Sequence, residues 1–512
     1  MAPQGESSFY GILSSPSLLP WLLSDTMFSQ MLRTAGPGGR TLAHAMAKAG
    51  DELGLRALHT HGAALLVATD DDGRSPAWLA ALESDQAVAL RSLRVLHELE
   101  AVPPPTHHEL TALFRTGRDQ VARLLLELGC LSAANLVAYE ANSGLIIAGG
   151  SLAGVSVFFK KASMLHVLAE AGAAETLIRK DSQGRTAVHC ILMDEDSIRA
   201  LHALSPAGAL SACDDKGRTA AHVAAERNGS AAILRALAQL GAGDTLTAVD
   251  SDGRTPLLCL WRECSLVDYG GDEPDRSCLT QCLVALHELC GVNALTATDQ
   301  AGATVVHLAA NSRGSEDFIR RVADLGGADL LTQQDSRGHT PALWAARSGH
   351  VRVLSLLDSL GADLSRAAPH DSAAGVAPAH AAAAHGYTEC LRVISTAGGS
   401  LTVSDELGWT PAHEATYTGT QRLPEYYAPG VDHAACLRLI QQLGPPDSLT
   451  KTTNGGLSLA HTAASGGNAG ILQTLVDLGL GASLAAVDNT GRVPAFGPFL
   501  LCVPDAQRRL HL

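Results

Sequence analysis

Leucine and other aliphatic residues recur at helical spacing in many short stretches, each followed by glycine. Clear examples are AAILRALAQLGA (231–242), SCLTQCLVALHELCG (277–291) and HVRVLSLLDSLGA (350–362). Apolar residues spaced three and four apart predict helices that bury one face. Since such helices are short and one-sided, the pattern predicts thin helical layers rather than one large core.

The polar positions contain a repeated turn of the form Asp-x-x-Gly. It occurs eight times, at Asp70, Asp181, Asp214, Asp250, Asp299, Asp335, Asp405 and Asp488. A leucine stands four residues before every one of these aspartates: Leu66, Leu177, Leu210, Leu246, Leu295, Leu331, Leu401 and Leu484. This shared register predicts one structural unit used many times.

Each glycine of the turn is followed by a helix-start signal, as in GRTAAHVAAERNG (217–229) and GHTPALWAARSGH (338–350). Thr can cap the free amides of a first helical turn, and Pro at the first helical position loses no hydrogen bond. The spacing between turn glycines is 33 residues from 184 to 217 and 36 from 217 to 253. A unit of this length, with one turn and two helices, is typical of ankyrin repeats.

The segments GRTAAHVAA, ATVVHLAA, GWTPAHEAT and GHTPALWAA resemble the TPLHxAA motif of the ankyrin-repeat family. The resemblance covers about 13 units and implies an all-α repeat solenoid, an ankyrin-like stack of helix-turn-helix units with short β-hairpin loops. In the family the motif histidine is structural and ties a helix start to the neighbouring hairpin. The corresponding positions are aligned here as His44, Trp78, Thr111, Gly149, His189, His222, Leu258, His307, Leu343, His380, His413, His461 and Phe496.

The repeat register predicts the domain organisation. Residues 1–36 form an N-terminal segment, 37–492 the array, and 493–512 a truncated or degenerate C-terminal cap interrupted by Pro498. Insertions near 262–277 and 419–433 break the period, and both are expected between the two helices of one unit. The segment before each turn is longer than the family norm, which predicts slightly elaborated hairpins.

Composition and charge restrict the partners and the compartment. Aromatic residues make up 4% of the chain, and 37 basic against 52 acidic side chains give a formal charge of −15. Such a charge repels phosphate backbones and anionic bilayers, so nucleic acid is not expected as a partner. The most apolar stretch, Leu145–Phe159, has 15 residues, fewer than the roughly 20 that cross a bilayer. With 11 cysteines in no paired spacing and no signal-like leader, a monomeric array in the cytoplasm or nucleus is expected.

One cysteine-rich stretch allows two interpretations. Cys259, Cys264, Cys278, Cys282 and Cys290 lie near His287 and could supply a tetrahedral zinc site. Cys282 also aligns with Ile233, Ile471, Cys390 and Cys436, which favours a small buried apolar slot. Because no nucleotide, hydrolase or metalloprotease motif is present, neither enzyme activity nor a cofactor is expected.

The resemblance also implies where a partner would bind. Ankyrin-like proteins hold protein partners with hairpin tips and the exposed ends of first helices. The matching positions are Asp215, Lys216, Arg218, Glu226, Arg227, Ser251, Asp252, Arg254, Ser336, Arg337, His339, Arg347, Ser348, Glu406, Trp409 and Tyr417. Trp409 is predicted to be exposed and to contribute strongly, since Trp, Tyr and Arg dominate interface energetics.

The insertion at 419–433 adds Tyr426 and Tyr427 as candidate contacts, because tyrosine provides contact area with few rotors to freeze. The favoured function is a non-catalytic scaffold or adaptor. The alternative is a substrate-recruiting arm of a larger ligase, kinase or channel assembly. Neither the partner nor the biological process follows from the residues.

Overall fold

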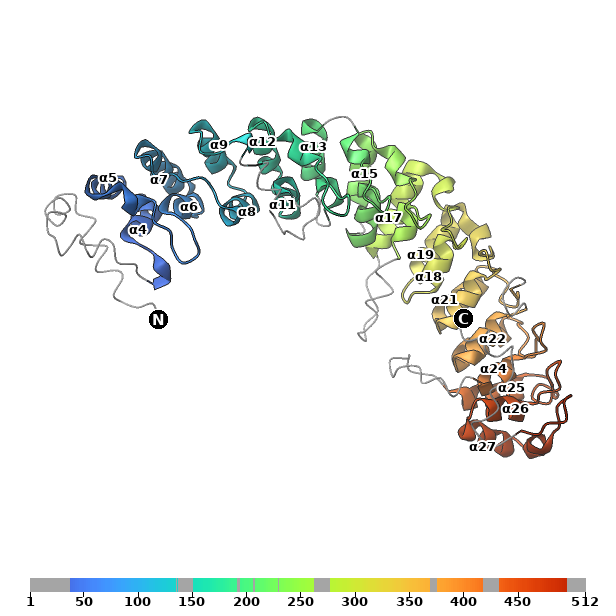
Figure 1. The fold of residues 1–512 in the computed structure, drawn as a ribbon. Helices are drawn as coiled ribbons and strands as arrows, with labels where there is room; N and C mark the ends of the chain where they lie inside the picture. The colour runs from blue at the N-terminus through green and yellow to red at the C-terminus, as the bar shows by residue number, and fades with distance from the viewer. Residues whose placement is uncertain are drawn as a thin grey trace. The chain divides into compact units, whose positions relative to one another are not determined.

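The computed structural model describes residues 37–494 except for 135, 137–150, 191–193, 206–207, 229, 262–276, 369–374 and 418–431. These residues are mainly helical, and an isolated β-bridge joins Ala368 and Val376. The predicted all-α class is therefore confirmed for this part of the chain (Figure 1). Its contacts divide into two units, which are described separately.

The first unit contains the described residues up to Val223, together with Ala236–Thr245. The first and second helices of successive repeats alternate along the chain. First helices contact first helices, as α4 does α6, and second helices contact second helices, as α7 does α9. The elements are α4 (Leu42–Ala49), α5 (Glu52–His61), α6 (Pro76–Ala81), α7 (Gln86–Glu98), α8 (His107–Thr116), α9 (Asp119–Glu127), α11 (Leu152–Phe158), α12 (Ala162–Glu170), α13 (Glu195–Leu204) and α14 (Ala220–Val223).

The second unit contains Ala224–Arg235 and the described residues from Leu246 onward. Each first helix contacts the next first helix from α16 to α26, and each second helix contacts the next from α17 to α27. Two helical layers result (Figure 1). The elements are α16 (Pro256–Cys259), α17 (Ser277–Cys290), α18 (Val305–Ala310), α19 (Glu316–Val322), α20 (Pro341–Arg347), α21 (Val351–Ser359), α22 (Pro378–Ala384), α23 (Thr388–Thr396), α24 (Pro411–Tyr417), α25 (His433–Leu443), α26 (Leu459–Ser465) and α27 (Ala469–Asp477), while α15 (Ala231–Gln239) has residues in both units.

The first helices are too short to be stable alone, because isolated helices below about 12 residues are marginal in water. α20 has 7 residues. It begins with Thr340, whose hydroxyl accepts from the Leu343 amide, followed by Pro341 at the first helical position. Its Ala345 and Ala346 are fully buried. Small side chains allow neighbouring first helices to approach closely, so packing stabilises what helix propensity alone would not.

The segment between each second helix and the next turn differs from the prediction. Elaborated hairpins were expected, but the additional residues form short 3₁₀ turns such as Ala63–Leu66, Ala174–Leu177 and Ala328–Leu331. These turns place the leucine of the repeat motif in the core, where Leu66, Leu177 and Leu331 are at most 2% exposed. Tight 3₁₀ turns are a common way to end a helix and redirect the chain.

Several predicted features lie outside the described residues. They are the N-terminal segment 1–36, most of the insertions near 262–277 and 419–433, and the C-terminal residues Phe496 and Pro498. No described helix has the length and hydropathy needed to cross a membrane.

The turn glycine Gly302 should be required for two separable reasons. Its φ is +74°, and a Cβ at this position would lie 2.7 Å from the Ser336 backbone nitrogen of the next turn. Gly302→Ala is therefore expected to lower the free energy of unfolding by more than the roughly 1 kcal/mol of a left-handed alanine alone. Urea unfolding followed by circular dichroism measures the change.

Gly73→Ala is the matched control, since Gly73 has a φ of +76° and no neighbouring atom within 4 Å of a built Cβ. Equal losses in the two variants would contradict a packing requirement at Gly302.

Candidate partner-binding surface

Every Asp-x-x-Gly turn is closed by its own aspartate. In all eight turns the aspartate Oδ1 accepts the backbone amides of the residues two and four positions later, at 2.7–3.0 Å. The aspartate amide donates back to the carbonyl of the residue four positions on, as Asp335 does to His339. The glycine between them has a positive φ in each turn. The carboxylate thus replaces the strand pairing of a longer hairpin.

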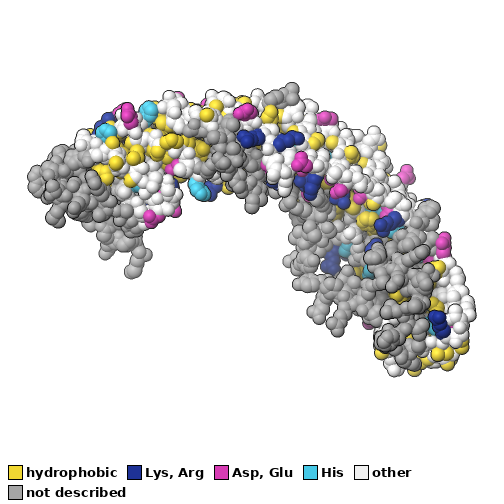
Figure 2. Space-filling model, viewed as in Figure 1, with side chains coloured by type: hydrophobic (Ala, Val, Ile, Leu, Met, Phe, Trp, Pro, Cys, Tyr) yellow, Lys and Arg dark blue, Asp and Glu magenta, His cyan; other side chains and the backbone are white. Residues whose placement is uncertain are grey.

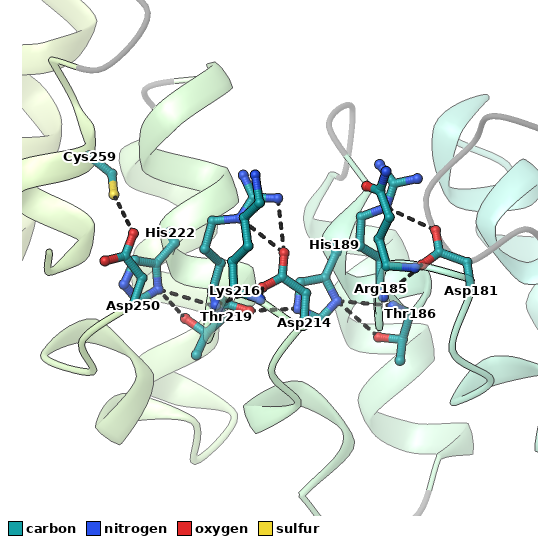
Figure 3. Close-up of polar contacts among 12 residues, drawn as sticks. Asp181, Arg185, Thr186, His189, Asp214, Lys216, Thr219, His222, Asp250 and Cys259 are labelled. Carbon is teal, nitrogen blue, oxygen red and sulfur yellow. Dashed lines mark hydrogen bonds and ion pairs between the residues drawn. The ribbon is translucent and has the colours of Figure 1, made fainter. Parts of the chain in front are cut away.

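The motif histidines connect these turns to the helices. His307 Nδ1 accepts the Thr304 amide at 3.1 Å, so its proton lies on Nε2, which donates to the His339 carbonyl at 3.0 Å. The same bridge to the following turn, at 2.9–3.2 Å, is made by His44, His189, His380, His413 and His461. Figure 3 shows the helix-start half of this arrangement at His189 and His222. The structural role implied by the resemblance is confirmed at these six bridging positions.

Two positions of the predicted alignment were wrong. Thr111 and Gly149 were assigned to the histidine position, which is the third residue of the first helix. The structure places Glu109 and Gly154 there, three residues after the N-caps Thr106 and Ser151. Both units lack the Asp-x-x-Gly turn, so the sequence offered no register mark to fix the alignment.

Glu109 performs only half of the histidine's role. It is 2% exposed, and its Oε2 accepts both the amide and the hydroxyl of Thr106 at 2.8 Å. Burial raises its pKa despite these bonds. These bonds run to the start of its own helix, whereas the histidines also reach the following turn.

The turns of successive repeats are also connected by the side chain of the residue after the aspartate. Ser336 Oγ donates to the Ala301 carbonyl at 2.7 Å, and the Gln300 side chain donates to the Ser251 carbonyl at 2.7 Å. Asn454, which follows Thr453 in a turn that lacks the aspartate, donates from Nδ2 to the Glu406 carbonyl. Side chains at this position therefore have a structural role that the sequence alone did not indicate.

Most predicted partner residues lie at the surface. The exposed ones are Asp215, Lys216, Ser251, Asp252, Ser336, Arg337, Arg347 and Glu406, and the half-buried ones are Arg218, Arg254, Ser348 and Tyr417. In the view of Figure 2, acidic and basic side chains are interspersed over the described surface. No single-sign field dominates that view, so individual side chains must provide any selectivity.

Three of the predicted partner residues are buried instead. The exposed fractions are 8% for Trp409, 8% for Glu226 and 7% for His339. Trp409 and His339 follow their turn aspartates by four positions, where the backbone amide is held by the carboxylate. The side chain is then directed onto the first helix. The Trp409 ring lies 5.5 Å from that of Tyr417, and His339 Nδ1 lies 3.3 Å from Asp335 Oδ2. Trp409 is therefore a packing residue rather than an exposed anchor.

Arg218 occupies the same turn position and is also directed inward. Its Nε lies 2.9 Å from Asp214 Oδ2, and Figure 3 shows the equivalent contact of Arg185 with Asp181. Burial alone would raise the pKa of Asp214, but the hydrogen bonds from the Arg218 amide and guanidinium outweigh it and lower the pKa. This arginine stabilises its own turn and is a weak candidate for partner recognition.

Other turns present tips of the same geometry that were not among the predicted partner residues. Asp71, Asp72, Ser182, Gln183 and Gln300 are exposed at equivalent turn positions. The Asp-x-x-Gly motif could have identified all of them. The side chains of Arg227, Tyr426 and Tyr427 lie outside the described residues.

The predicted cysteine slot is buried as expected. Cys282, Cys390 and Cys436 are fully buried, while Ile233 and Ile471 are 3% and 4% exposed. Burial raises the pKa of Cys282 and Cys390 to about 12, so these thiols stay protonated and unreactive at neutral pH. Among the described residues no group of three metal-binding side chains is assembled, and Cys264 is not among them.

Comparison with known proteins gives distant, partial matches. No protein-family model matches the chain. It is 30% identical over 110 residues to ankyrin repeat and SOCS box protein 3 of Bos taurus, covering 21% of this chain and 18% of that protein. It is 23% identical over 217 residues to the E3 ubiquitin-protein ligase KEG of Arabidopsis thaliana, covering 42% and 12%. It is 30% identical over 133 residues to alpha-latrotoxin-Lt1a of Latrodectus tredecimguttatus, covering 26% and 9%.

These matches suggest ankyrin-type repeats in the chain. The chain spans less than a fifth of the length of each of these curated relatives. Similarity over such a share concerns the repeat unit and not the activity of the whole relative.

The buried histidines should make the fold sensitive to mild acid. Burial lowers the pKa of His413 to about 4 and lowers those of His189 and His307. An unfolded histidine titrates near 6.5. The folded pKa lies below that value, so the stabilisation is present above about pH 6.5 and is lost as the pH falls through about 4.

Urea midpoints at about pH 7.5 and 5 measure this loss. His413→Gln should be less stable than the parent at the higher pH and lose less on acidification, whereas substitution of the exposed His166 should change neither. An unaltered pH dependence in His413→Gln would contradict the bridging role.

The cysteine slot should accept an aliphatic residue. Cys390→Val is expected to change the free energy of unfolding by less than about 1.5 kcal/mol, because the swap nearly conserves volume. Thermal melting and metal analysis of the purified protein test this. Stoichiometric zinc that disappears in the variant would favour the metal interpretation instead.

Proposed function

We propose that this chain is a non-catalytic ankyrin-repeat scaffold or adaptor of about 13 units that binds a protein partner through its turn tips and first-helix ends. The main support is the row of identically closed turns. Each turn holds its backbone rigid by internal bonds and presents side chains outward. Rigid presentation lowers the entropic cost of binding.

The second tip position is the strongest candidate for partner contact. Lys216 and Arg337 stand two residues after their aspartates, and their backbone amides donate to the carboxylate. Their side chains are exposed and take no part in closing the turn. Ser336 and Gln300, at the first position, are engaged with the preceding turn. The first tip position therefore connects successive turns, and the second is available to contact a partner.

A non-catalytic function fits the state of the titratable groups. The bridging histidines use both ring nitrogens in backbone links, as His307 does. The turn carboxylates are likewise engaged by amides. Such groups are not available to exchange protons with a substrate.

The second candidate function is recruitment of a substrate to a larger assembly. One relative is named an E3 ubiquitin-protein ligase and another an ankyrin repeat and SOCS box protein. An array like this one could supply the recruiting arm. Co-purification of the chain with a ubiquitin-transferring complex would favour this candidate over a free scaffold.

The tip positions can be tested with one triple variant, Lys216→Ala with Asp252→Ala and Arg337→Ala. Exposed surface substitutions change stability by less than about 0.5 kcal/mol each, so melting should be nearly unchanged. Affinity capture with quantitative mass spectrometry should show loss of the partners that the parent chain retains.

Arg94→Ala, an exposed residue on α7, serves as the control for a change in surface charge. Retention of every partner by the triple variant would overturn the role of the tips.

A further inference from the structure

We propose that the loops between the first and second helices at α8–α9 and α11–α12 form a binding surface for an acidic segment of a partner protein. The surface consists of Phe158, Phe159, Lys160 and Lys161, with Arg118 at its edge, all in the first unit. The Arg118 guanidinium also donates to the Ser84 and Leu82 carbonyls at 3.3 and 3.4 Å, so the two lysines supply the available charge. The surface lies at the C-terminal ends of α8 and α11. The inference rests on the proposed protein-binding function and names the chemistry of one partner segment.

Lys160 has an unfavourable backbone conformation. Its φ is +57°, a left-handed value that costs a residue with a Cβ about 1 kcal/mol or more. In six other units the residue before the second-helix N-cap also has a positive φ and is glycine: Gly50, Gly117, Gly314, Gly349, Gly386 and Gly467. The lysine thus replaces the residue that the backbone favours, and its side chain is exposed.

The next position also carries a cation where helix stability favours an acid. Arg118 and Lys161 are the N-caps of α9 and α12, and neither side chain caps its helix. In other units Asp51, Asp85, Asp194, Asp432 and Asn468 occupy this position and accept first-turn amides, whereas Ser315, His350 and Tyr387 also leave their helices without a side-chain cap. A cation at a helix N-terminus also opposes the helix dipole. Two consecutive described helix pairs therefore carry a cation at this position.

Lys160 and Lys161 directly follow two half-buried aromatic residues in the chain. Phe158 and Phe159 are in edge contact, with ring centroids 5.1 Å apart. A Cβ built on Gly117 would lie 2.5 Å from Lys161 Cδ, so the lysine stem covers the α8–α9 loop. This contact joins the two loops into one surface.

Acids of α9 and of the α6–α7 loop pair with other cations. Asp119 pairs with Arg123 at 3.3 Å, and Glu83 pairs with Lys48 at 3.8 Å. None of the ion pairs among the described residues involves Lys160 or Lys161. The surface therefore offers positive charge and apolar area together, at the expense of local stability. A partner segment in which carboxylates stand next to an apolar residue would match both the charge and the apolar area.

A short protein segment fits better than an extended polyanion. The chain carries a formal charge of −15, which opposes close approach of nucleic acid or an anionic bilayer as a whole. Charges more than about 8 Å away are largely screened at physiological salt. A narrow acidic segment interacts mainly with the local cations and is less affected by the distant acids.

The test compares affinity with stability in Lys160→Gly/Lys161→Asp. Glycine relieves the backbone and aspartate restores the cap, so the melting temperature should rise. Anisotropy of the full chain with a fluorescein-labelled peptide of Glu, Asp and Leu residues should show affinity weakened about tenfold or more, as expected for two lost charge contacts. A higher melting temperature together with a weaker affinity is not expected when residues with a purely structural role are replaced.

Arg94→Asp controls for the charge change, and Lys160→Gln/Lys161→Gln repeats the comparison if the first variant melts lower than the parent. Equal affinity in parent and variants, or equal binding of a peptide with Gln in place of the acids, would overturn the inference. Stronger competition by phosphatidylserine vesicles or single-stranded RNA than by unlabelled acidic peptide would also overturn it. Loss of partners in the tip variant with unchanged peptide binding would keep the two proposals separate.

Discussion

The fold depends on one interaction, the closure of each turn by an aspartate and its connection to the neighbouring helix by a histidine. A helix of about seven residues has too few internal hydrogen bonds to persist in water. The histidine satisfies an amide at the helix start and donates to the next turn, as His307 does between Thr304 and His339. The elements that carry a bridging histidine are thereby fixed at their starts, and in α20, which has none, alanines such as Ala345 and Ala346 bring neighbouring first helices into close contact.

This interaction explains why an exposed side chain of the turn can change without loss of the turn itself. The groups that close the turn are backbone amides, a buried carboxylate and an imidazole, and none of them depends on the side chain two positions after the aspartate. Lys216 and Arg337 can therefore vary without loss of the turn. The position four residues after the aspartate has less freedom, since Trp409, His339 and Arg218 all direct their side chains inward.

The loops at the other ends of the first helices show the reverse relation. There, glycine and a capping acid are what the backbone favours, as at Gly50 and Asp51. Lys160 and Lys161 depart from both preferences in adjacent positions. A sequence that gives up stability in this way at an exposed loop is best understood through what the loop contacts, because packing alone would select the common residues.

The sequence by itself determined the repeat and the helical class, because these depend on local chemistry: a turn aspartate, a left-handed glycine, a cap and helical spacing. The role of the histidines was implied by the resemblance to the ankyrin-repeat family. The sequence could not place the third and fourth units, where the turn motif is absent and Glu109 takes the histidine position. It also could not decide which turn residues are exposed. Trp409 resembles an exposed aromatic in the sequence and is buried because Tyr417, eight residues later on α24, lies against it. Burial depends on contacts between elements, and only the tertiary structure brings those elements together.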